Sequence, residues 1–224
     1  MVMEFFRAGG QSTGIQAVEE QLVQMLHDGR TVYDASSGAV FGGGKSPETK
    51  QEVKGTDREI NEAQQDVRRT LMLHSAVTAD VDLPLVLAYM SVVKDAERIG
   101  DYAKNIYDLA KYGVDFEDAL DRAELEGYSS NVAQLISDAA DVFAGRDAEK
   151  AQHLIDKADG FLDDYDARVK AAYQSTGAVS DAVARALYYR YLKRITAHVM
   201  NILTALVAPL PRLDYYDEAK DDRD

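Results

Sequence analysis

The sequence of 224 residues contains no cysteine, which excludes disulfide bonds, zinc–thiolate sites and a thiol nucleophile. It has only four prolines, and Pro47, Pro209 and Pro211 fall at the predicted ends of helices. No stretch approaches the roughly 20 apolar residues that a membrane-spanning helix needs. The N-terminus also lacks the apolar run of a signal peptide. A soluble cytoplasmic protein is therefore expected.

Basic residues are also scarce. The chain has 25 lysines and arginines against 39 aspartates and glutamates, which gives a formal net charge of −14. Phosphate contacts require a basic surface, so the composition argues against nucleic acid as a partner.

Good helix formers dominate, and apolar residues recur at spacings of three and four, whereas the alternation typical of strands is rare. The sequence therefore predicts an all-α fold. Gly42, Gly43 and Gly44 end the first helix, Ser46 caps the second, and Asp147 caps the fifth after a stop at Gly145. Six helices are predicted, at residues 15–41, 47–77, 83–111, 117–143, 148–173 and 181–207.

The second half of the chain repeats the plan of the first. Arg98-Ile99 matches Arg194-Ile195, and Asn105-Ile106 matches Asn201-Ile202, both 96 residues downstream. A repeat of this length is too long for a solenoid unit. It fits two tandem three-helix bundles of long antiparallel helices. The expected units are residues 14–113, residues 117–210 and an acidic tail at 211–224.

An acidic stripe is the main candidate site. At about 100° per residue, Glu97, Asp101 and Asn105 share a helix face nearly opposite the apolar seam. If the second and third helices are neighbours, Asp57 and Asn61 approach this stripe. Oxygen ligands of this kind suit magnesium, calcium, manganese or iron. The alternative is a solvated face on which the two acids pair with basic neighbours, namely Lys94, Arg98 and Lys104.

The run from Glu97 to Ile106, Glu-Arg-Ile-Gly-Asp-Tyr-Ala-Lys-Asn-Ile, resembles the signature of the PhoU family of phosphate-uptake regulators. The acid-rich run from Asp57 to Asn61 resembles the opening of the family's second helix. The family's two tandem three-helix bundles also match the duplication.

The resemblance implies a non-enzymatic regulator of phosphate uptake and of phosphate-starvation signalling. Its partners would be the ATPase of a phosphate ABC transporter, a sensor histidine kinase or both, with membrane contact only through them. A homodimer stays open. Family members bind iron or other divalent metals, so the resemblance implies iron, manganese, magnesium or zinc here. The implied metal ligands are Glu97, Asp101, Asp57, Glu59 and Asn105.

The second copy of the motif departs from this pattern. Lys193 and Ala197 stand where the two acids would be, and the lysine would repel a cation. A metal site of the motif type is therefore expected in the first bundle only. His198 is interpreted as a hydrogen-bonded structural residue.

Other functions are disfavoured or left open. The run from Gly42 to Ser46 is similar to a phosphate-binding loop, but that motif needs a preceding strand, and a helix is predicted there. The pattern of di-iron bundle enzymes and the elbow of serine hydrolases are both missing from the sequence. A metal-binding bundle unrelated to phosphate and an accessory subunit of another ion transporter stay as alternatives.

Overall fold

The computed structural model describes residues 13–44 and 46–213, and within them the predicted all-α fold is confirmed. Residues 214–224 of the predicted acidic tail lie outside the described residues. None of the described helices is both long and apolar enough to cross a membrane. The α-helices are α1 (Thr13–Gly38), α2 (Pro47–Val77), α3 (Leu83–Lys111), α4 (Arg122–Gly145), α5 (Ala148–Tyr173) and α6 (Val179–Val207).

Side-chain caps fix where three of these helices begin. Ser46 Oγ accepts a hydrogen bond from the Thr49 amide at 3.1 Å, with Pro47 as the first helical residue. Asp82 caps α3 in the same way, and Asp147 caps α5 through the Lys150 amide at 3.0 Å. These caps explain why the bounds of α2, α3 and α5 agree with the predicted ones.

The end of α1 and the start of α4 differ from the prediction. A π-helical turn, η2 (Ala39–Gly43), follows α1, and α4 begins at Arg122 rather than at residue 117. The linker packs against this turn, because the Phe116 amide donates to the Val40 carbonyl at 2.7 Å. Gly42 has φ +88°, and a Cβ there would lie 2.5 Å from the Glu117 carboxyl carbon. The positive φ favours glycine at this position, and the Phe116–Val40 bond holds the linker out of the helix.

The end of α4 also corrects the prediction that Gly145 is the residue that stops the helix. Gly145 is the last helical residue, and Arg146 adopts the left-handed conformation at φ 51°. Its guanidinium pairs with Glu19 of α1, which in turn accepts a hydrogen bond from the Tyr89 hydroxyl of α3. The arginine thus ties the end of α4 to two helices of the first bundle, which offsets the cost of its backbone conformation.

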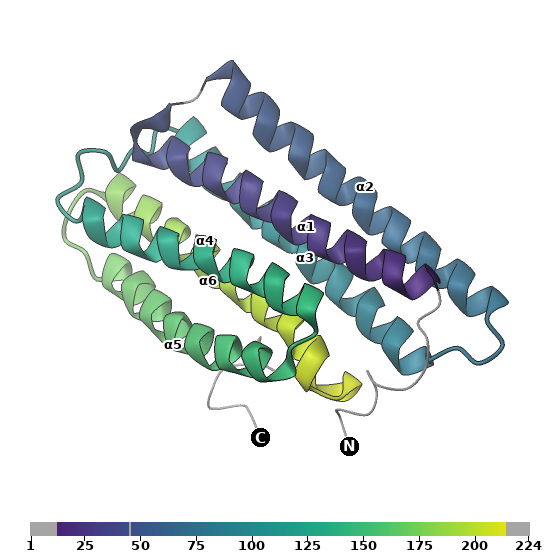
Figure 1. Ribbon diagram of the computed structural model, residues 1–224. Helices are drawn as coiled ribbons and strands as arrows, with labels where there is room; N and C mark the ends of the chain where they lie inside the picture. The colour runs from purple at the N-terminus through teal and green to yellow at the C-terminus, as the bar shows by residue number, and fades with distance from the viewer. Residues whose placement is uncertain (1–12, 45, 214–224) are drawn as a thin grey trace.

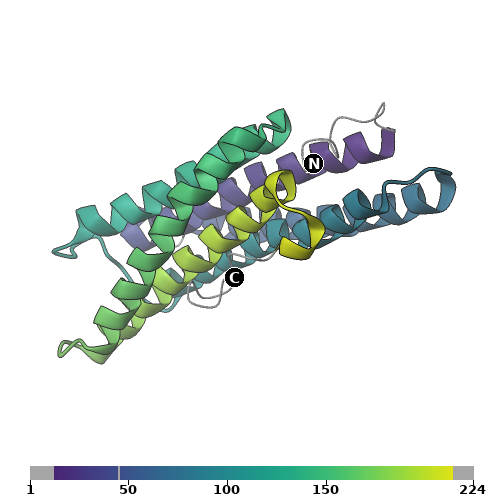
Figure 2. The same cartoon turned by 90° about the horizontal axis from the view of Figure 1, so that it is seen from below.

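The helices form two groups of three, α1–α3 and α4–α6, that lie against each other along their length (Figure 1). Helix α3 packs on α6, and α1 packs on α4. The view from below shows the same arrangement, with α6 running beside α3 (Figure 2). Buried apolar residues from all six helices make one continuous core. The two predicted bundles are therefore joined by a packed junction and not by a flexible linker.

The junction of α3 and α6 has internal symmetry. Asp95 of α3 contacts His198 of α6 at 2.8 Å, and Tyr102 of α3 contacts Tyr191 of α6 with ring centroids 6.1 Å apart. Asp95 and Tyr191 occupy the same repeat position, as do Tyr102 and His198, since each pair differs by 96 residues. The two contacts are therefore related by a pseudo-twofold axis through the junction.

Candidate functional site

Glu97 of the acidic stripe does not face away from the core as predicted. Its side chain is only 8% exposed, and Lys94 Nζ lies 2.6 Å from its Oε2. The reason is that α3 packs against α1, α2 and α6, so that little of its circumference faces solvent. The prediction had assigned α3 one apolar seam, whereas the helix has three neighbours.

Asp57 and Asp101 lie close together, as expected if α2 and α3 are neighbours. Lys104 joins them, with its Nζ 2.8 Å from both carboxylate oxygens of Asp57 and 3.3 Å from Asp101 Oδ1. Partial burial lowers the pKa of Lys104, but the hydrogen bonds and charges of the two aspartates outweigh this effect and raise the pKa. The lysine is therefore held in its charged form between the two acids.

The other two predicted metal ligands take no part in the ion pairs described above. Glu59 is exposed on α2 and Asn105 is half-buried on α3. Arg98 adds a third cation to the stripe, 3.6 Å from Asp101. The predicted pairing of the acids with basic neighbours of the same helix is thus confirmed.

The stripe as folded is not a preformed metal centre. Lys94, Arg98 and Lys104 compensate the three carboxylates on α2 and α3. Among the residues that the structure describes, no group of three or more histidine, cysteine, aspartate or glutamate side chains is placed to hold a metal ion. A cation would have to displace Lys104 from between the two aspartates. Metal binding by these residues stays a prediction.

Gly100 of the motif has a packing role. A Cβ on this residue would lie 2.8 Å from Cδ1 of Ile60, a buried residue of α2. The missing side chain allows α2 to approach α3 closely, which brings Asp57 within reach of Lys104. The glycine therefore sets the helix spacing on which the Asp57–Lys104 ion pair depends.

A buried polar cluster at the α3–α6 junction was missed by the sequence analysis. Asp95 Oδ1 accepts hydrogen bonds from His198 Nδ1 at 2.8 Å and from Asn201 Nδ2 at 3.1 Å. All three residues are buried, and His198 stacks on the Tyr102 ring at 5.6 Å. The expected structural role of His198 is confirmed. The signal for Asp95 is its helical position, because it stands four residues before the buried Ile99, on the apolar side of α3.

The second copy of the motif holds no acids in the equivalent places. Lys193 on α6 pairs with Asp166 of α5 at 2.5 Å, and Ala197 is buried. The lysine thus makes an ion pair between two helices of its own bundle, and the absence of a metal site of the motif type from this copy stays a prediction.

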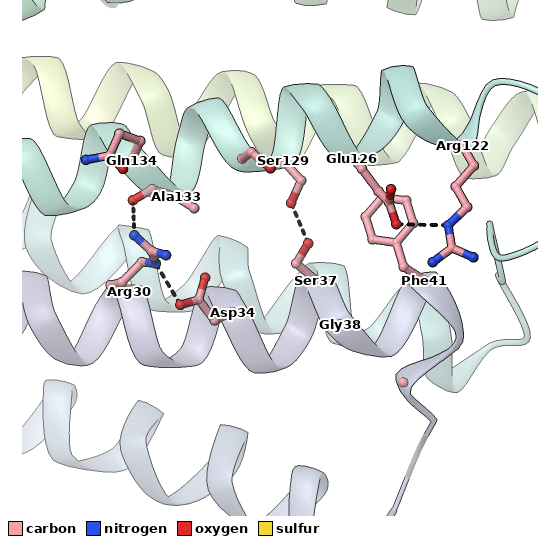
Figure 3. Close-up of a pocket in the computed structure, with 12 residues that line it drawn as sticks. Arg30, Asp34, Ser37, Gly38, Phe41, Arg122, Glu126, Ser129, Ala133 and Gln134 are labelled. Carbon is pink, nitrogen blue, oxygen red and sulfur yellow. Dashed lines mark hydrogen bonds and ion pairs between the residues drawn. The ribbon is translucent and has the colours of Figure 1, made fainter.

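A groove of about 630 Å³ follows the seam between α1 and α4 (Figure 3). Arg30 crosses the seam, bonding to the Ala133 carbonyl at 2.6 Å and to Ser137 Oγ at 2.7 Å. Ser37 and Ser129 meet farther along the same seam, with their Oγ atoms 2.5 Å apart. The lining includes two arginines and two acids, which pair as Arg30–Asp34 and Arg122–Glu126. These contacts join the two bundles, and the groove has no net charge to attract an ion.

Comparison with known proteins shows which family this chain resembles. Residues 22–110 match the family model of the PhoU domain. The first half of this chain is similar to the PhoU domain. The match covers most of α1, all of α2 and nearly all of α3, which includes the intact Glu97–Asp101 motif, so the PhoU resemblance seen in the sequence is confirmed.

Relatives of known sequence and structure agree with the PhoU assignment. The "Phosphate-specific transport system accessory protein PhoU homolog" of Synechocystis is 29% identical over 153 residues, 66% of this chain and 67% of that protein. The PhoU structure from Pseudomonas aeruginosa superposes with a TM-score of 0.73 at 23% identity, over 89% and 97% of the two chains. The "phosphate transport system regulatory protein PhoU" from Streptococcus pneumoniae gives 0.71 at 21%, over 89% and 94%. The two structures show that the whole six-helix fold is that of PhoU.

Proposed function

We propose that this chain is a regulator of phosphate uptake and of the phosphate-starvation response that acts in the cytoplasm by protein–protein contact. The match of residues 22–110 to the PhoU domain carries the proposal. The names of the Synechocystis relative and of the S. pneumoniae protein, both tied to phosphate transport, support it. Its partners are the ATPase of a phosphate ABC transporter, a sensor histidine kinase or both.

The side chains of the described core favour a binding role over catalysis. Asp95 and His198 are hydrogen-bonded deep in the α3–α6 junction, and the acids of the stripe are paired with cations. A catalytic base needs access to a substrate proton, and these groups are engaged within the fold. We therefore propose that the protein is not an enzyme.

Co-purification tests this function. The tagged chain, expressed in its native host at high phosphate, is expected to retain the phosphate transporter ATPase or the sensor kinase, as identified by mass spectrometry. Deletion of the gene is expected to raise phosphate uptake under the same conditions. Retention of neither partner, together with unchanged uptake in the deletion strain, would overturn the proposal.

A metal at the acidic stripe is the second part of the proposal. Asp57 and Asp101 already converge on one cation, the Lys104 ammonium, so a divalent or ferric ion could take the place of this group. Glu97, Glu59 and Asn105 are the remaining candidate ligands. The protein would then hold iron, manganese, magnesium or zinc at the surface of its first bundle.

Metal content should therefore depend on the stripe. Elemental analysis of the purified protein is expected to find less bound metal in the Glu97→Ala/Asp101→Ala variant than in the wild type. Lys104→Gln is expected to bind more, since it removes the competing cation. Lys193→Gln is the matched control, because this lysine pairs with Asp166 in the second bundle. Equal metal content in all four proteins would remove the proposed site and leave the phosphate function standing.

A further inference from the structure

The two helical hairpins of the molecule turn at equivalent positions. Helix α2 ends at Val77 and α3 begins at Leu83, whereas α5 ends at Tyr173 and α6 begins at Val179. Both pairs differ by 96 residues, which is also the offset between the two copies of the motif. The turns α2–α3 and α5–α6 are therefore the same element of the repeat.

Both turns expose large apolar side chains at the same three repeat positions. Single exposed apolar residues are common on soluble proteins, but a recurrence at three equivalent positions is not expected from chance exposure. The six side chains are between 46% and 82% exposed. We call them tip A (Val77, Leu83 and Leu87) and tip B (Tyr173, Val179 and Val183).

The tips lie at opposite ends of the molecule. In Figure 1 the α2–α3 turn is at the right-hand end of the bundle and the α5–α6 turn at the left-hand end. This follows from the antiparallel packing of α3 on α6, which places the first residues of the two helices far apart. The pseudo-twofold axis of the junction therefore relates tip A to tip B.

Acidic residues accompany both tips. Asp80 and Asp82 are exposed in the turn at tip A, and Asp181 is exposed in the first turn of α6 at tip B, where it pairs with Arg185 at 2.9 Å. The whole chain carries a formal charge of −14. A surface that receives these tips should therefore combine an apolar pocket with a basic rim, because complementary charge favours encounter and correct orientation.

We propose that tips A and B are two copies of one docking surface, and that they bind a partner presenting the same apolar, basic-rimmed pocket twice. Two equivalent tips related by a twofold fit two identical subunits related by a twofold. The inference rests on the proposed function, in which the transporter ATPase is a partner. One chain then bridges two ATPase subunits, and the two contacts strengthen each other through effective concentration.

Binding of the purified transporter ATPase to four variants tests this bridge. Val77→Ser/Leu83→Ser removes tip A, Tyr173→Ser/Val179→Ser removes tip B, and a third variant combines them. Tyr112→Ser is the control, since Tyr112 is as exposed as the tips but its repeat equivalent is Ala208. Affinity is measured by interferometry, stoichiometry by light scattering, and retention of the fold by circular dichroism.

Each single-tip variant is expected to bind at least about tenfold more weakly than the wild type, and the combined variant to lose binding. The wild type should form a complex of one chain with two ATPase subunits, and Tyr112→Ser should behave like it. Wild-type affinity in either single-tip variant, or an equal loss in Tyr112→Ser, would overturn the bridge while leaving the proposed function intact. No binding by the wild-type chain would overturn both.

Discussion

The protein is expected to unfold cooperatively as the pH rises from about 10 to 12. Burial raises the pKa of Tyr189 to about 12 and raises the pKa values of four further buried tyrosines well above their usual range, so that the folded chain keeps these phenols neutral. In the unfolded chain they ionise near pH 10. Stability is therefore fully present below pH 10 and falls above it, by about 1.4 kcal/mol per pH unit for each tyrosine. The four are Tyr33, Tyr89, Tyr165 and Tyr188.

Far-ultraviolet circular dichroism and tyrosinate absorbance, recorded on the same samples, check this expectation. The helical signal should be lost in the step in which the buried tyrosines ionise. Ionisation of all tyrosines near pH 10 with the helices intact would contradict the burial of the five phenols.

Asp95→Ala is expected to lower the free energy of unfolding by about 3 kcal/mol, because it leaves two buried donors without an acceptor. His198 Nδ1 and Asn201 Nδ2 both donate to Asp95 Oδ1, and all three residues are less than a tenth exposed. Asp95→Asn keeps an acceptor oxygen at this position and should cost clearly less. Urea unfolding followed by circular dichroism measures both variants.

Asp108→Ala is the matched control for this substitution. Asp108 lies on the same helix and also pairs with a basic neighbour, Lys111, but its side chain is 40% exposed. Surface pairs of this kind contribute little, so a change below about 0.5 kcal/mol is expected. Similar losses for Asp108→Ala and Asp95→Ala would show that the junction cluster has no special part in stability.

Much of the fold could be predicted because local signals fixed the helices. Ser46 with Pro47, and Asp147 after Gly145, mark helix starts within a few residues of sequence. The start of α4 could not be found this way. Residues 117–121 do not continue α4 because the hydrogen bond between Phe116 and Val40 holds the linker against the end of α1. This bond, like the approach of Glu117 to Gly42, joins residues that are far apart in the chain.

The candidate site shows the same division between local and long-range information. The ion pairs of Lys94 and Arg98 with the stripe follow from helical spacing, and they were predicted. The burial of Glu97 depends on the three helices packed around α3, and the Asp95–His198 bond depends on α6, which lies about 100 residues away. Periodicity reports one apolar face of a helix, and it cannot report that three other helices surround it.

The symmetry of the α3–α6 junction bears on how such a molecule arises. Were a single repeat to pair with a copy of itself, positions 95 and 102 of the two copies would meet twice in identical form, because a homodimer must carry the same side chains on both sides of its axis. In the duplicated chain one side has Asp95 against His198, and the other has Tyr191 against Tyr102. Fusion of two repeats into one chain thus allows the side chains of each contact to change independently of the other contact. The acidic motif shows the same independence of the two repeats. The first repeat keeps Glu97 and Asp101, whereas the second has Lys193 and Ala197 at the equivalent positions.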